Sequence, residues 1–253
     1  MFKTIFTAHT AVITACLALF AAGCASNGQI ISEETIVRSA EAQWTALLEQ
    51  APLTENEGYK ARTHAVAERI LLAAGENPDE WRVAVFESDE TFNAFALPNK
   101  AIGVFTGILT ISQTDSQLAT VIGHEVAHVR LKHGEERVNR ELAPRILAGV
   151  AQIPGEVVGV DAVRTAGAIA GAGVKAGTIL PFNRNQELEA DLEGLNYLAE
   201  AGYDPKEAAL LWREIERHHE DKGKVPEFLS THPSGERRIK RLEEAAAELE
   251  NAS

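Results

Sequence analysis

Two histidines and a glutamate within five residues are the first feature of this sequence that could do chemistry. They lie in "GHEVAH", where His124 and His128 are four residues apart and Glu125 follows the first histidine. On an α-helix, residues i and i+4 lie on one face, so both imidazoles can bind one metal ion. Glu125 lies about 100° further around the helix, where it can take a proton from a metal-bound water. The pattern indicates a zinc site, although H-E-x-x-H also occurs by chance.

The surrounding sequence predicts the helix that this geometry requires. Residues 115–133 carry apolar side chains at helical spacing, and Thr114 with Gln117 can form a capping box at the start. Gly134 is the predicted stop. The helix is mostly apolar, so burial of its histidines and glutamate would be costly without a role. Gly123 lowers helix propensity and predicts that another segment packs closely there.

A zinc ion that activates water needs a third protein ligand and an open fourth position. One known solution adds a third histidine in the pattern H-E-x-x-H-x-x-G-x-x-H. Here Leu131 occupies the glycine position and Gly134 the histidine position, so that solution is excluded. The other solution takes a glutamate from a later helix.

Residues 182–202 predict such a helix, with leucines at helical spacing. Glu187 can ligate the ion from it, and Asp191 lies one turn further along the same face. Asp191 can accept a hydrogen bond from a ligand imidazole, which fixes the tautomer of that ring. The same acidic residues could be a plain solvated surface, which is the interpretation we take for Glu189 and Glu193.

These two segments and two others resemble the gluzincin metallopeptidase family that includes HtpX, LoiP, BepA and the CAAX prenyl proteases. The other two are "NAFALPNKAIGVFTGIL", residues 93–109, and "STHPSGERRI", residues 230–239. All four follow the family's order over roughly residues 81–240, a stronger signal than H-E-x-x-H alone. The family's second motif reads S-R-x-x-E-x-x-A-D, and here Asn183 replaces the serine. Because the tetratricopeptide tail of BepA is not seen, the expected likeness is to short lipoprotein members such as LoiP.

The resemblance implies the fold class and the metal ligands. The fold is expected to be α+β and mainly helical, a zincin-like metalloprotease domain with a small β-sheet beside the H-E-x-x-H helix. His124, His128 and Glu187 are implied to bind one Zn²⁺ per chain. The third ligand thus maps onto Glu187 and not onto Glu189. Glu125 is the implied general base, which accepts a proton from water and returns it to the leaving amine.

Two late residues complete the expected site. His232 resembles a late histidine of gluzincins and is the expected second catalytic residue, a donor to the oxyanion. Arg238 is expected to tie the last helix to Asp191 or to the metal site. The alternatives are a capping or surface histidine and a surface arginine.

The segment Asn93–Leu97 is expected to lie at the cleft as an edge strand. Asn93, Ala94 and Phe95 form the expected substrate strand, to which the backbone of a substrate adds as a further strand. Pairing of this kind tolerates many sequences, so unfolded or misassembled envelope proteins are the expected substrates.

Length and composition suit one globular domain. The chain has 253 residues, 45% of them hydrophobic, and we expect a single metallopeptidase domain over residues 33–253. Aromatic residues make up only 6% and alanine is plentiful, which favours helices. The net charge of −13, without a basic cluster, argues against nucleic-acid binding by charge.

Residues 1–23 read as a lipoprotein signal peptide and are excluded from the fold. Its removal would leave Cys24 as the one cysteine of the mature chain, so a disulfide within the chain cannot explain it. Residues 24–32 are then a lipidated tether that anchors the protein to a membrane. Residue 25 is Ala rather than Asp, and its resemblance to the bacterial lipoprotein sorting rule implies the periplasmic face of the outer membrane of a Gram-negative cell. A plain signal peptide or an uncleaved anchor is the alternative.

The remaining sequence predicts two strands and several helices. Strands are predicted at 81–88 and 101–111, and helices at 33–50, 57–74, 187–201, 205–220 and 235–250. Charged residues interrupt the Gly/Ala/Val-rich residues 142–181, whose uncharged runs are too short for a membrane span. We expect one or two helices there, which form either a lid or a plain connection.

Together these features predict a zinc-dependent endopeptidase that removes unfolded or misassembled envelope proteins. One alternative is a chaperone-like or peptide-binding lipoprotein whose zinc is non-catalytic or absent, since structural zinc has four closed protein ligands. Another is hydrolysis of something other than peptide, such as a cell-wall amide. Three candidate ligands beside a positioned glutamate favour the protease.

Overall fold

The computed structural model describes residues 31–140, 182–222, 227–233 and 235–252. The predicted signal peptide 1–23, most of the tether 24–32 and the segment 142–181 lie outside the described residues. None of the helices within these ranges combines the length and apolar character that a membrane span requires.

The described residues form a mainly helical protein with one small sheet, which confirms the predicted α+β class. In chain order the elements are α2 (Glu33–Gln50), α3 (Glu57–Ala73), the 3₁₀ turn η1 (Pro78–Glu80), β1 (Arg82–Phe86), β2 (Ala94–Leu97), β3 (Ala101–Phe105), α4 (Thr106–Ile111), α5 (Asp115–Arg130), α8 (Arg184–Glu200), α9 (Lys206–Lys222), α10 (Glu227–Thr231) and α11 (Glu236–Ala252).

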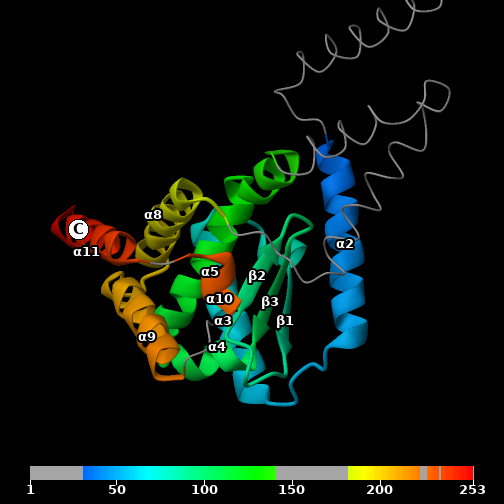
Figure 1. The fold of residues 1–253 in the computed structure, drawn as a ribbon, viewed down its shortest axis with the longest axis horizontal. Helices are drawn as coiled ribbons and strands as arrows, with labels where there is room; N and C mark the ends of the chain where they lie inside the picture. The colour runs from blue at the N-terminus through cyan, green and yellow to red at the C-terminus, as the bar shows by residue number, and fades with distance from the viewer. Residues whose placement is uncertain (1–30, 141–181, 223–226, 234, 253) are drawn as a thin grey trace, which may run out of the picture.

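Helix α5 is the centre of the fold. The sheet lies on one side of it and helices α8, α9 and α11 on the other, while α2 stands beyond the sheet (Figure 1). Every residue from Leu118 to His128 is buried. A helix that is covered all round packs as a core element rather than as an amphipathic surface helix. The polar residues on α5 are therefore held inside the protein.

The sheet has strand order β1-β3-β2, with β1 parallel and β2 antiparallel to β3. Strand β2 is the edge that packs against α5. Side chains alternate along it: Ala94 and Ala96 join the main core, whereas Phe95 and Leu97 pack in a second cluster with Trp44 of α2. The Phe95 side chain therefore faces α2 and not the α5 side, and Asn93 precedes the strand.

The prediction of a strand over 101–111 is wrong for its second half, which forms α4. The Thr106 hydroxyl accepts a hydrogen bond from the Ser88 backbone N–H at 2.9 Å. A Cβ on Gly107 would lie 2.4 Å from the Thr91 carbonyl oxygen, so this turn needs a glycine. Periodicity cannot separate a short apolar strand from a buried helix, and here the Thr-Gly turn decides.

The two ends of α5 differ in part from the prediction. Thr114 caps the helix by accepting from Gln117 N–H at 3.1 Å, but the Gln117 side chain returns to Gln113 N–H rather than to Thr114. The prediction that the helix runs to 133 and stops at Gly134 is wrong. The chain turns at Lys132, whose φ is 56°, and a new helix covers 133–140.

A pair of glycines lets α5 and α8 cross closely. A Cβ on Gly194 would lie 3.0 Å from the carbonyl carbon of Gly123 and 3.0 Å from the backbone nitrogen of His124. One on Gly123 would lie 3.2 Å from the Gly194 carbonyl oxygen. The prediction of close packing at Gly123 is thus confirmed, and its partner is the helix that carries Glu187.

We expect Gly194→Ala to lower the free energy of unfolding by about 1–3 kcal/mol, the usual cost of overpacking a core. The added methyl group meets backbone atoms that cannot rotate away, so α8 must move from α5. Urea unfolding of the full-length chain measures the change. Gly235→Ala is the matched control because its Cβ would meet nothing within 4 Å. Equal unfolding midpoints for the two variants would contradict the need for a close crossing.

Candidate metal centre

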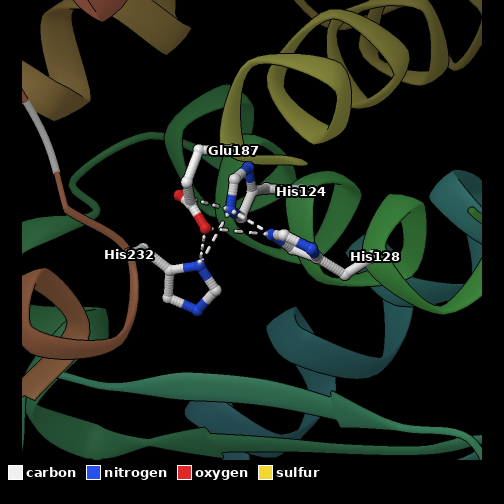
Figure 2. A group of neighbouring side chains, drawn as sticks. All are labelled: His124, His128, Glu187 and His232. Carbon is white, nitrogen blue, oxygen red and sulfur yellow. Dashed lines mark hydrogen bonds and ion pairs between the residues drawn. The ribbon is translucent and has the colours of Figure 1, made fainter. Parts of the chain in front are cut away.

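Four buried side chains meet at the crossing of α5 and α8. His124 and His128 come from α5, Glu187 from α8 and His232 from the segment after α10 (Figure 2). One donor atom from each of the four lies within 4.8 Å of the others. The Nε2 atoms of His124 and His128 are 3.0 Å apart, which realises the one-turn spacing predicted from the sequence.

The N-terminus of α8 is fixed by a capping box. The Asn183 side chain accepts from the backbone N–H of Gln186, whose side chain accepts in turn from the Asn183 N–H. Asparagine is as good an N-cap as serine, so Asn183 can cap α8 as a serine would. Glu187 lies in the first turn of this capped helix, with its side chain toward α5.

Two further side chains hold His124. Asp191 Oδ1 lies 2.9 Å from His124 Nδ1, and Arg238 from α11 binds Asp191 through both Nε and Nη2. Arg238 Nη1 also lies 2.6 Å from Glu187 Oε2. Arg238 is 7% exposed, so it is a buried member of the site and not a surface charge.

The donor set fits a metal ion. Because the Asp191 carboxylate only accepts hydrogen bonds, His124 Nδ1 must carry the proton and Nε2 must hold a lone pair. That lone pair faces His128 Nε2, His232 Nδ1 at 3.1 Å and the Glu187 carboxylate. Converging buried lone pairs repel unless a cation lies between them. Imidazole and carboxylate donors suit several divalent transition metals.

Glu125 lies beside the ligand group, with its carboxylate toward the sheet. Its Oε2 accepts from the Ala96 backbone N–H of β2 at 3.3 Å, and its Oε1 lies 3.2 Å from His232 Nε2. Burial raises the pKa of the Glu125 carboxyl, and the neighbouring His232 and His124 offset part of the rise. A raised pKa makes the carboxylate a stronger base.

The charges of the site are balanced locally. Burial alone would raise the pKa of Glu187, but the nearby His232 and His128 and the charge of Arg238 hold it well below its ordinary value. Asp191 behaves in the same way, since the contact with Arg238 outweighs the effect of burial on its pKa. Both carboxylates are therefore ionised inside the protein.

The structure places His232 differently from the sequence expectation. We expected a donor to the oxyanion beside three ligands, but His232 Nδ1 lies within the ligand group, 3.1 Å from Glu187 Oε1. Its backbone N–H bonds to the Phe228 carbonyl in the first turn of α10, which sets its position. The sequence identified the residue but gave no signal for which nitrogen faces the ligands.

Two residues near the site were missed by the sequence analysis. The ring of Phe182 stacks on His128 with centroids 3.9 Å apart and planes 21° apart. The second is His133, which is 2% exposed and whose Nδ1 lies 3.0 Å from His128 Nδ1. The available signal was a third histidine five residues after His128. On a continuous helix that spacing does not put two residues on one face, and only the turn at Lys132 brings the two rings together.

Comparison with known proteins agrees with this geometry. The model of the family "Peptidase family M48" matches residues 57–246, which include all four donors, Glu125, Asp191 and Arg238. The chain belongs to peptidase family M48. The match begins with α3, so α2 precedes the shared region.

Known proteins that are similar in sequence to this chain carry protease names. The mitochondrial metalloendopeptidase OMA1 of Schizosaccharomyces pombe is 33% identical over 179 residues, covering 71% of this chain and 50% of that protein. OMA1 of Arabidopsis thaliana is 39% identical over 165 residues, covering 65% and 31%. The beta-barrel assembly-enhancing protease of Escherichia coli is 27% identical over 192 residues, covering 75% and 39%. This chain thus spans about half or less of the length of these relatives.

Proposed function

We propose that this protein is a zinc-dependent endopeptidase. The observation that carries the proposal is Glu125, a buried carboxylate that adjoins the group of His124, His128 and Glu187 without belonging to it. Zinc held by that group supplies Lewis acidity toward a peptide carbonyl and toward water. A purely structural site would have no use for a further buried carboxylate at its edge, where burial is costly.

Glu125 acts as the base and then as the acid in this proposal. Its carboxylate accepts a proton from the attacking water and delivers it to the leaving amine. The Ala96 N–H bond holds the carboxylate toward the sheet, and the raised pKa strengthens it as a base. Glu187 and Asp191 are poorer bases, because their pairing with Arg238 helps to hold the pKa of each carboxyl below its ordinary value.

The outer edge of β2 supports binding of substrate as an added strand. Backbone groups in antiparallel pairs alternate between the partner strand and the free edge. Asn93 bonds to β3 through its carbonyl, while the Ala96 N–H points away from β3 and reaches Glu125. Ala94 is buried, so the half-buried Ala96 presents the accessible part of this edge. A peptide added there would run beside the base, and its side chains would need no specific sequence.

A second candidate is a binding module with a non-catalytic zinc. It is favoured by one observation, that His232 brings the number of converging donor groups to four. Four closed protein ligands are typical of structural zinc, and three with an open position are typical of catalytic zinc. The two candidates differ in whether metal is needed for peptide cleavage or only for folding.

The test measures metal content and cleavage on one preparation of the full-length chain. We expect bound zinc, cleavage of casein, loss of cleavage on treatment with a chelator, and recovery when zinc is returned. Urea unfolding with and without chelator shows whether the fold survives metal removal. A zinc-loaded, folded chain that does not cleave casein or other unfolded proteins would favour the binding module.

We also propose a role in protein quality control at the cell envelope, in a short LoiP-like lipoprotein. The name of the beta-barrel assembly-enhancing proteases among its relatives supports action on assembling envelope proteins. The lipid anchor at Cys24 and the outer-membrane location rest on the sequence alone.

Cys24→Ser is expected to abolish lipid modification, because the acceptor thiol is lost. The protein should then leave the membrane fraction or remain unprocessed. Mass spectrometry of the N-terminal peptide and fractionation of the cells measure both results. Cys16→Ser is the matched control and should be modified and anchored normally, since residue 16 lies in the predicted signal. A wild-type N-terminal peptide without an acyl chain would contradict the prediction.

A further inference from the structure

His128 and His124 are supported in different ways on the side away from the ligand group. His124 Nδ1 meets the buried carboxylate of Asp191 at 2.9 Å. His128 Nδ1 meets no carboxylate in the described structure and instead faces His133 Nδ1 at 3.0 Å. A ring nitrogen facing a ring nitrogen does not by itself fix which one carries the proton.

A third residue removes this ambiguity. His133 Nε2 lies 3.2 Å from Glu189 Oε2 on α8. The carboxylate only accepts, so a neutral His133 ring must carry its proton on Nε2 and hold a lone pair on Nδ1. His128 must then donate from Nδ1, which leaves its Nε2 free as a ligand. The reverse arrangement would place the lone pair of His133 Nε2 against the carboxylate and a proton of His128 inside the ligand group.

The other contacts of the His128 ring do not determine which of its edges points to the ligand group, so the hydrogen bond with His133 must do so. Phe182 stacks on the face of the His128 ring, and Arg137 lies over Phe182 with its guanidinium carbon 4.1 Å from the ring centroid. Stacking fixes the plane of a ring but not which edge points inward. The contact with His133 at the outer edge therefore sets the rotation and the tautomer.

We propose that His133 is a positioning residue that holds His128 in the metal-binding tautomer through the chain Glu189–His133–His128. The inference deepens the proposed function and rests on it, because it concerns the same metal group. His133 touches neither metal nor substrate. It acts only through His128, in the way that hydrogen-bond partners of ligand histidines orient the ring and raise its basicity.

The two outer members of the chain differ in how easily they are replaced. His133 is 2% exposed, so bulk water does not reach its position and cannot replace its hydrogen bond to His128. The Glu189 side chain is 63% exposed, so water can accept the His133 proton when the carboxylate is removed. His133 should therefore matter much more than Glu189.

The test measures the zinc dissociation constant of the full-length chain by competition with a chelating dye. We expect His133→Phe to weaken zinc binding by about 10–100-fold, the usual effect of losing a partner of a ligand histidine. His133→Asn places an amide oxygen near Nδ1 and should recover most of the affinity. Glu189→Ala should weaken zinc binding less than His133→Phe, because water can accept the His133 proton in place of the carboxylate.

A second measurement needs no variant and no metal. Nitrogen-15 spectra of the imidazoles in the metal-free wild-type chain report the tautomer of each histidine. We expect His128 to be protonated on Nδ1. Should His133→Phe fail to fold, this spectrum alone decides the proposal.

Two results would overturn the inference without touching the proposed function. One is a wild-type chain that binds zinc no more tightly than His133→Phe. The other is metal-free His128 protonated on Nε2. A wild-type chain that binds no zinc would overturn the proposed function, and the positioning role would be lost with it. If His133 had a merely structural role, His133→Phe would change the unfolding midpoint. It would not change the tautomer of His128, and His133→Asn would not recover the zinc affinity.

Discussion

Replacing Glu125 with glutamine is expected to lower peptide cleavage by about 10²–10⁴-fold, the range attributed to general acid–base catalysis. The substitution keeps the size of the side chain and an oxygen that can accept from the Ala96 N–H. It removes only the carboxylate that accepts and returns the proton. Zinc content and the free energy of unfolding should therefore stay near wild type, and substrate should still bind.

Casein cleavage, zinc content and capture of unfolded protein are compared for wild type, Glu125→Gln and Glu68→Gln. Glu68 is an exposed glutamate on α3, so its variant controls for loss of one negative charge. If the protein is a binding module, Glu125→Gln should leave its cellular function intact, since binding needs no proton acceptor. Full complementation of a deletion strain by a Glu125→Gln protein without proteolytic activity would contradict the proposed protease function.

The part of the site that lies on one helix could be predicted from the sequence. His124, Glu125 and His128 are positioned by the helical period, which is a local rule. The same rule placed Glu187 and Asp191 on one face of α8. Joining the two helices into one site needed the family resemblance, because no local rule says which helices cross. The glycine at 123 was the one residue that indicated a close neighbour.

The contacts between distant segments could not be predicted. His232 is 108 residues from His124, and which of its nitrogens joins the ligand group depends on how α10 packs on the core. Glu189 was assigned to the surface, and its side chain is indeed exposed, yet it bonds to the buried His133. The turn at Lys132 makes this contact, and a φ of 56° at a lysine has no sequence signal.

Replacing Arg238 with methionine is expected to destabilise the metal-free protein by about 3–5 kcal/mol, the cost of breaking a buried ion pair from one side. Arg238 is the cation that Asp191 and Glu187 share, and all three side chains are almost fully buried. Methionine can still cover the ring of Trp212, over which the guanidinium carbon lies at 3.9 Å. The loss then comes mainly from the two carboxylates left without a counter-charge.

The expected loss depends on metal, and this dependence separates the ion pair from simple packing. Zinc at the ligand group would bring a second positive charge to Glu187, so the destabilisation should be smaller in the loaded protein than in the chelated one. Urea unfolding of the full-length chain in both states measures the difference. Arg213→Met is the matched control, because Arg213 pairs with Glu243 where both side chains are about half exposed, and solvent screens such pairs. Equal stability of wild type and Arg238→Met in chelator would mean that Asp191 and Glu187 are neutralised by something other than Arg238.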